Sequence, residues 1–160
     1  MYISAKVDYA LRALLVLAAA PDTPLTGEQV AAAQTLPVKF IENTLVDLRR
    51  AGFVTSQRGR EGGYRLARPP AEIVVADVIR ALEGPLAEVR GERPEDTVYE
   101  AAAANLQHVW VAVRAALRLV LESVTLADIL SGDLPQPVAE LLAAPDAWER
   151  RTLGPPPPRP

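Results

Sequence analysis

Apolar side chains at the start of the chain recur every three or four residues, which is the spacing of amphipathic helices. A first helix is predicted over residues 4–19, because one face of that segment is apolar and carries Val7, Leu11, Leu14 and Ala18. A second helix is predicted over residues 26–34, where Thr26 and Gln29 form a capping-box pattern. Both helices are therefore expected to pack against a common core.

A third helix is predicted over residues 38–51, and its two faces differ in character. The inward face is apolar and consists of Ile41, Leu45 and Leu48. The outward face is mainly polar and carries Lys39, Glu42, Asn43, Val46 and Arg50. Gly52 supplies a stop after the helix. Such a helix packs on one side and presents a polar surface on the other.

Two short strand-like runs, residues 53–57 and 64–67, follow the third helix. Residues 58–66 read RGREGGYRL, with three glycines and three arginines. Glycine permits tight turns, and arginine supplies forked hydrogen-bond donors. This composition predicts a β-hairpin with a cationic tip. Two helices joined by a short turn and followed by such a hairpin predict a winged helix-turn-helix in a mainly α fold.

In a helix-turn-helix the second helix of the pair lies in the major groove of DNA, and its first residues contact the bases. Lys39, Glu42 and Asn43 occupy that part of the third helix, and their side chains match donors and acceptors on base edges. Further candidates for contact with DNA, mainly with phosphates, are Thr26, Arg49, Arg50, Arg58, Gly59, Arg60 and Arg65. The alternatives are solvated charges on an ordinary helix and turn, or a winged-helix module that binds protein without binding DNA.

The distribution of charge favours the DNA hypothesis. The net charge of −3 argues weakly against contact with nucleic acid. Residues 1–70 nevertheless hold nine basic and six acidic side chains, and residues 37–70 hold seven against three. Residues 71–160 hold eight basic and fourteen acidic side chains. The basic half is therefore expected to contact phosphates, whereas the acidic half is not.

The second half of the chain is predicted as helices arranged around one long helix. A linking helix over residues 72–82 ends at a Gly-Pro pair, and residues 84–96 form a charged loop. The segment 97–123 is predicted as the long helix, because its apolar residues alternate in steps of four and three like a coiled-coil seam. The seam consists of Leu106, Trp110, Val113, Leu117, Val120 and Val124.

A second, smaller apolar face of the same helix consists of His108, Ala112, Ala115 and Leu119. A helix with two apolar faces needs two partners. The simplest partners are the winged helix of the same chain and the same helix of a second subunit, which together give a homodimer. The alternative is a central helix buried in the core of a monomer. The dimer is favoured, because its two-fold symmetry matches the two half-sites of a palindrome.

The expected organisation has four parts. They are a winged helix-turn-helix with its linking helix over residues 1–83, a loop over 84–96, dimerisation and C-terminal helices over 97–144, and a disordered tail over 145–160. The chain ends in GPPPPRP, a composition that does not support a packed core.

Several motifs carry a resemblance to a known family. They are residues 4–10 (SAKVDYA), 38–42 (VKFIE), 48–54 (LRRAGFV), 58–64 (RGREGGY) and 73–79 (IVVADVI). Over roughly residues 1–131 the chain resembles the Rrf2 family of bacterial winged-helix regulators. The resemblance implies a homodimer that binds an imperfect palindrome and represses or activates transcription. By position it places Tyr2, Ser4 and Lys6 beside the DNA backbone, and it places Lys39 and Glu42 at the bases.

The chain has no cysteine, which excludes disulfides, thiolate metal sites and cysteine nucleophiles. Iron–sulfur members of the family hold their cluster with cysteines in the loop before the long helix, so no cluster, metal or other cofactor is expected here. His108 falls near the position of a non-cysteine cluster ligand in some relatives, and it is expected to be a packed residue. A small-molecule effector could bind between the winged helix and the long helix, and the sequence does not identify it.

The sequence argues against catalysis and against a membrane segment. The single histidine and the lack of cysteine leave only a serine–histidine pair as a nucleophile and base, and no serine lies in an elbow motif. No apolar run approaches the ~18 residues of a membrane span. A non-enzymatic cytoplasmic protein is therefore expected, with double-stranded DNA and a second copy of the chain as its partners.

Overall fold

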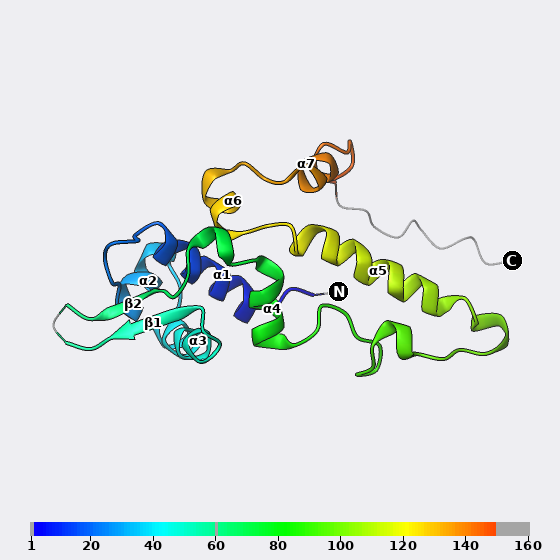
Figure 1. Ribbon diagram of the computed structural model, residues 1–160, viewed down its shortest axis with the longest axis horizontal. Coiled ribbons are helices and arrows are strands. Elements are labelled where there is room, and N and C mark those ends of the chain that lie inside the picture. The colour runs from blue at the N-terminus through cyan, green and yellow to red at the C-terminus, as the bar shows by residue number, and fades with distance from the viewer. Residues whose placement is uncertain (1, 60, 150–160) are drawn as a thin grey trace, which may run out of the picture.

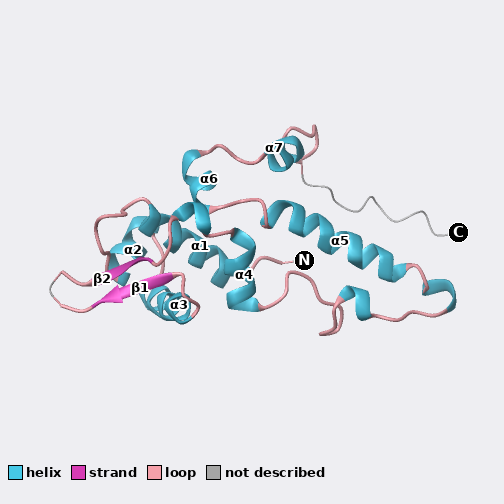
Figure 2. Cartoon of the chain, in the orientation of Figure 1, coloured by secondary structure: helices cyan, strands magenta, loops and turns pink. Residues whose placement is uncertain are grey.

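The computed structural model describes residues 2–59 and 61–149 and has an elongated shape (Figure 1). Its elements are α1 (Ala5–Ala18), α2 (Gly27–Gln34), α3 (Val38–Arg50), β1 (Val54–Gln57), β2 (Gly63–Leu66), α4 (Val75–Glu83), α5 (Leu106–Leu121), α6 (Leu126–Ser131) and α7 (Gln136–Leu142). Helices dominate, and β1 and β2 form the one sheet of the described residues (Figure 2). The predicted mainly α fold with a β-hairpin wing is confirmed.

Local sequence signals set limits of the first two helices. The Oγ atom of Ser4 accepts a hydrogen bond from the backbone N–H of Val7 (3.2 Å) and caps α1. The capping box predicted at Thr26 and Gln29 is present at the start of α2. The chain leaves α2 through Thr35, whose left-handed backbone (φ 54°) turns it toward α3.

The main core lies between α1, α2, α3, the hairpin and α4. Leu14 of α1 and Ile41, Leu45 and Leu48 of α3 are 0% exposed in this core. The predicted inward face of α3 is therefore confirmed. Each fully buried side chain of this size contributes about 1.5–3 kcal/mol relative to its exposed state, so the position of α3 is firmly fixed.

The wing is an antiparallel hairpin in which Gln57 lies opposite Gly63. Gly63 has a φ of 154°, and a Cβ atom at this position would lie 2.7 Å from the backbone of Leu25. Because the glycine permits this close approach, Leu25 and Tyr64 exchange two backbone hydrogen bonds of 3.0 and 2.8 Å. These hydrogen bonds hold the wing against the segment that precedes α2.

A second, smaller core joins α4 to the C-terminal helices. The backbone N–H of Val75 donates to the carbonyl of Val124 (2.9 Å). Val124 is 7% exposed and packs with Val75 and Val138. Val124 was predicted to belong to the dimerisation seam. In the structure it is covered by its own chain, so it is not available to a second subunit.

The long helix α5 is shorter than predicted. It begins at Leu106, and residues 97–105, also predicted to be helical, fold back along it. Thr97 is buried, and the side-chain amide of Gln107 donates to its carbonyl (2.7 Å). This contact holds the segment beside the helix instead of in line with it. The helix-favouring alanines of the segment do not outweigh such contacts, because propensity differences are small.

Two further boundaries differ from the predictions. The linking helix α4 begins at Val75, because residues 70–72 form a separate 3-10 turn. Residues 145–149 were predicted to begin a disordered tail, but they form turns in which Trp148 donates to a backbone carbonyl at the end of α7 (3.2 Å). The remainder of the predicted tail, residues 150–160, lies outside the described residues.

The helix α5 runs from the far end of the molecule back toward the winged helix (Figure 1). The helix α7 lies on the same side of the winged helix as α5 (Figure 1). None of the α5 residues is buried, although many are apolar. No helix in the described part of the chain is both long and apolar enough to cross a membrane.

Candidate nucleic-acid interface

The polar face of α3 is open to solvent at its N-terminal end. Lys39, Glu42 and Asn43 are all exposed, and the Lys39 side chain is 87% exposed. Its Nζ atom lies 3.7 Å from a carboxylate oxygen of Glu42. Exposed pairs of this kind contribute little to stability. These side chains can therefore exchange the pair for hydrogen bonds to base edges.

Further contacts hold α3 in place against α1 and within the helix itself. The Phe40 ring meets the Tyr9 ring of α1 edge to face, with the centroids 5.2 Å apart. Thr44 is buried, and its hydroxyl donates to the carbonyl of Phe40 (2.9 Å). Together with the apolar core, these contacts fix the rotation of α3 and so decide which of its side chains face outward.

Lys6, which was predicted to lie beside the DNA backbone, is paired with α3. Its Nζ atom lies 2.9 Å from one oxygen of Asp47, and Nη1 of Arg50 lies 3.6 Å from the other. The hydrogen bond from Lys6 lowers the pKa of Asp47, and the nearby charge of Arg50 lowers it further. Asp47 is not among the residues predicted from the sequence, although its spacing from Arg50 is that of a helical ion pair.

The wing places further cations beside α3. Nη1 of Arg49 donates to Oγ of Ser56 on β1 (3.2 Å), which joins the end of α3 to the wing. Arg58 and Gly59 are exposed toward the hairpin tip, where Gly59 has a φ of 111°. The candidate Arg60 lies outside the described residues. Ser56 is not predicted from the sequence, because its contact with Arg49 depends on how the hairpin folds back.

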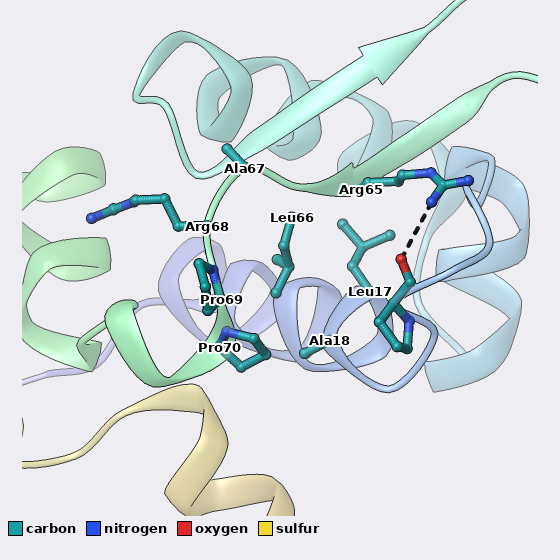
Figure 3. Close-up of a pocket in the computed structure, with 9 residues that line it drawn as sticks. Leu17, Ala18, Arg65, Leu66, Ala67, Arg68, Pro69 and Pro70 are labelled. Atoms are coloured by element: carbon teal, nitrogen blue, oxygen red, sulfur yellow. Dashed lines mark hydrogen bonds between the residues drawn. The ribbon is translucent and has the colours of Figure 1, made fainter.

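Arg65 makes a structural contact in the wing. Its Nη1 atom donates to the carbonyl of Pro21 (3.3 Å), in the turn after α1 (Figure 3). The same region encloses a cavity of about 280 Å³ whose walls include Leu17, Leu66 and Pro70. Arg65 therefore helps to hold β2 against α1, and its predicted role at phosphates stays a prediction.

The remaining candidates lie at the starts of helices. Thr26 is exposed, and its hydroxyl accepts the backbone N–H of Gln29 (3.2 Å) in the capping box. Ser4 caps α1 in the same way, and Tyr2 is exposed just before α1. Ser4 and Thr26 thus have structural roles, and contact with DNA is an additional prediction for all three residues.

A hollow between α2 and the wing was not anticipated from the sequence. It has a volume of about 480 Å³, and its walls include Asp22, Gln29, Gln57 and Glu61. Thr26 and Arg65 also line it, so the wall holds two carboxylates and one arginine and is less favourable to phosphate than a surface of cations alone. The exposed cations suited to DNA are instead Arg49 and Arg50 at the end of α3 and Arg58 in the wing.

Comparison with known proteins places this winged helix in a family. The sequence model of the Rrf2 family, described as "Iron-dependent Transcriptional regulator", matches residues 3–132. The "Putative HTH-type transcriptional regulator Rv1287" of Mycobacterium tuberculosis is 49% identical over 142 residues and covers 88% of both chains. The chain belongs to the Rrf2 family. It is a DNA-binding transcriptional regulator, and its relatives are named as regulators, not as enzymes.

Solved structures of Rrf2 proteins have the same fold. The structure of CymR, the global cysteine regulator of Bacillus subtilis, is similar with a TM-score of 0.71 and 33% identity, covering 82% of this chain and 98% of that one. The IscR structure from T. potens is similar with a TM-score of 0.68 and 34% identity, covering 83% and 88% of the two chains.

The donors of this Rrf2 protein do not fit an iron–sulfur cluster. Such clusters are held by thiolates, and the chain has no cysteine. Within residues 2–59 and 61–149, no group of three or more His, Asp or Glu side chains is placed to hold a metal ion. His108 was predicted to be packed, but it is exposed on α5. The loop before α5 is held by protein contacts, which include the ion pair of Glu95 with Arg114.

The predicted dimerisation seam of the Rrf2 chain is exposed over part of its length. Leu106 and Val113 are 36% and 39% exposed. Trp110 and Leu117 are half-buried, and Nε1 of Trp110 donates to the Tyr99 hydroxyl (3.1 Å). Toward the end of the helix, Val120 packs against the smaller core that contains Val124. The free part of the seam is therefore the part farthest from the winged helix.

Proposed function

We propose that this Rrf2 protein is a homodimeric, cytoplasmic repressor that reads a palindromic operator. The observation that carries the proposal is the exposed polar face at the start of α3, which is backed by a buried core and flanked by an exposed wing. In a helix-turn-helix this face enters the major groove. A fixed helix with free polar side chains is what sequence-specific reading requires.

The side chains on α3 differ in the bases that they can recognise. Lys39 can donate to guanine, Glu42 can accept from the amino group of cytosine, and Asn43 can pair with adenine. Arg49, Arg50 and Arg58 are exposed nearby and are suited to phosphates, where they set affinity and salt dependence. Sequence preference is therefore assigned to α3, and general affinity to the surrounding arginines.

A second copy of the chain is proposed as the partner of α5. None of the α5 residues is buried within the chain, and the N-terminal half of the helix projects away from the winged helix (Figure 1). The proposed interface consists of Leu106, Trp110, Val113 and Leu117, with Val120 at its edge. Val124 is excluded, because its own chain covers it. Two-fold pairing would present two copies of α3 to two half-sites.

Repression is the proposed outcome, because a dimer that occupies both half-sites of an operator excludes other proteins from that DNA. An unbiased selection of bound fragments from genomic DNA tests the function. We expect enrichment of fragments that share a palindrome, and affinity that falls roughly 10³-fold between about 50 and about 200 mM salt. A reporter gene placed behind such a fragment should be expressed less when the protein is present.

The selection also distinguishes the alternative of a winged helix that binds only protein. That alternative predicts no enriched fragment, and it predicts that Arg58→Ala leaves function intact. Enrichment without a shared motif, or affinity that does not respond to salt, would contradict sequence-specific binding through phosphates and bases.

A further inference from the structure

Four arginine side chains from three segments of the chain line one small cavity. Arg80 comes from α4, Arg93 from the loop before α5, and Arg114 and Arg118 from α5. The cavity has a volume of about 240 Å³, and its other walls are Pro85, Leu86, Ala87 and Glu95. These cations gather in the acidic half of the chain, residues 71–160, which holds eight basic and fourteen acidic side chains.

Two of the arginines are held by carboxylates that do not line the cavity. Glu122 forms an ion pair with Arg80, and the same carboxylate oxygen lies 3.6 Å from Nε of Arg118. Asp77 lies 3.1 Å from Nη1 of Arg80. Because neither carboxylate is part of the wall, these pairs orient the guanidinium groups and leave the cavity itself open.

Of the other two arginines, only Arg114 is paired with a carboxylate of the described residues. Arg114 forms an ion pair with Glu95, and its side chain is only 14% exposed. A guanidinium group has five N–H donors, and the bond to Glu95 is the only one that the Arg114 side chain makes within the described residues. The Arg93 side chain lies in no ion pair or hydrogen bond of that part of the chain. The cavity therefore presents surplus positive charge and unused donors.

We propose that this cavity binds a small oxyanion, a phosphate or sulfate group that is either free or attached to a small metabolite. A tetrahedral oxyanion offers several acceptors to converging donors, and the arginine fork matches its geometry. The volume is below the roughly 300–1,000 Å³ of sites for drug-sized ligands, which limits the ligand to a compact anion. The apolar wall formed by residues 85–87 strengthens the attraction, because it lowers the local dielectric constant.

The position of the cavity couples anion binding to DNA binding, and this coupling rests on the proposed function. Arg80 belongs to α4, which packs on α1 of the winged helix. Arg118 belongs to α5, the proposed dimerisation helix. Glu122 already bridges these two guanidinium groups, so an anion that contacts both competes with this bridge and thereby changes the orientation of the winged helix relative to the dimer seam. The anion then acts as the effector of this cysteine-free protein.

Isothermal titration calorimetry of the full chain tests the site without DNA. The probes are inorganic phosphate, inorganic sulfate and glycerol phosphate, each compared with sodium chloride at equal ionic strength. We expect saturable binding of at least one probe, with one site per chain. The Arg93→Gln variant should bind roughly tenfold more weakly, because one charge-assisted donor is lost. Comparison of the three probes shows whether a free anion or an esterified phosphate is preferred.

A matched control comes from the same loop. Arg90 lies over the ring of Tyr99 (5.7 Å) and does not line the cavity, so Arg90→Gln should bind the probe as the wild type does. A second test variant, Arg118→Gln, should also bind more weakly, with circular dichroism confirming that each variant is folded. An absence of saturable heat with every probe, or equal weakening by Arg93→Gln and Arg90→Gln, would overturn the site.

A second arm measures affinity for a selected DNA fragment with and without the bound probe, at constant ionic strength. We expect a change of at least about threefold in the wild type, and in Arg93→Gln we expect the same change only at roughly tenfold higher probe concentration. Anion binding without this change would overturn the coupling. A protein that binds no DNA would overturn the proposed function, whereas calorimetry alone decides whether the anion site exists.

Discussion

The winged helix and α5 use apolar residues in opposite ways. In the winged helix, apolar residues of several elements meet in one core, and residues such as Leu14 and Leu45 are 0% exposed. In α5 apolar residues are even more frequent, but none is buried. The winged helix is thus complete within one chain, whereas α5 exposes a surface that a folded protein normally covers. The difference teaches that the winged helix buries its apolar residues within one chain, whereas the apolar residues of α5 are left for the second copy that we propose as its partner.

The largest effect is expected from a truncation in the core of the winged helix. Leu14→Ala should lower the free energy of unfolding by about 2–5 kcal/mol, because it removes buried atoms and leaves a cavity. Urea denaturation followed by circular dichroism measures the change. The control is Val98→Ala at a position that is 81% exposed, where a change within about 0.5 kcal/mol is expected. Equal effects at the two positions would show that the core is not where the structure places it.

A charge in the seam of α5 should separate the subunits while leaving the winged helix folded. Val113→Asp places a carboxylate in the proposed interface, and we expect the dimer to dissociate at least about tenfold more readily, because the charge loses water on association. Sedimentation equilibrium measures the dissociation constant. Val98→Asp, an equivalent change outside the seam, should leave it unaltered. A monomeric wild type at micromolar concentration would contradict the proposed role of α5.

Two substitutions should separate base reading from phosphate binding within the DNA-reading unit. Glu42→Ala should relax base preference at one position, with a loss of about 1–3 kcal/mol of discrimination. Arg58→Ala should weaken binding to all sequences and lower the salt slope by about one unit. Fluorescence anisotropy with operator variants at several salt concentrations measures both effects. If both variants lost only general affinity, α3 would not be the reading element.

The smallest effect is expected from pH, through the ion pair between α1 and α3. Lys6 lowers the pKa of Asp47 in the folded state, so the pair stabilises the fold above the unfolded pKa of about 3.9. This contribution is lost as the pH falls through the lower folded pKa. Because the groups are about one-third exposed, the effect should be only a few tenths of a kcal/mol. The free energy of unfolding, measured at pH 7 and pH 3, gives the size of this contribution. The Asp47→Asn variant should lack this part of the pH dependence.

The sequence predicted the winged helix better than the second half of the chain, and the reason lies in the range of the contacts. The capping box at Thr26 and the apolar face of α3 are local signals, and the structure confirms both. The start of α5 depends on Gln107 reaching back to Thr97, a contact that periodicity does not reveal. Val124 matches the seam pattern, but its carbonyl accepts a hydrogen bond from Val75 at the start of α4.

The candidate DNA-contact residues were predicted individually, but their partners were not. The sequence placed Lys6 and Arg49 near DNA, whereas the structure also shows the Asp47 and Ser56 contacts that orient them. The arginine-lined cavity was missed entirely, because its members are distant in sequence and meet only when α4, the loop and α5 pack together. Side chains that converge from separate elements leave no periodic signal in the chain.

Footprinting on a selected operator tests the central claim that two copies of this winged helix bind DNA with two-fold symmetry. We expect two protected half-sites related by two-fold symmetry, with centres about one helical turn apart or a multiple of it. Protection should disappear from both half-sites together in Val113→Asp at concentrations where the wild type protects them fully. A single protected half-site, or full protection by a variant shown to be monomeric, would contradict the account.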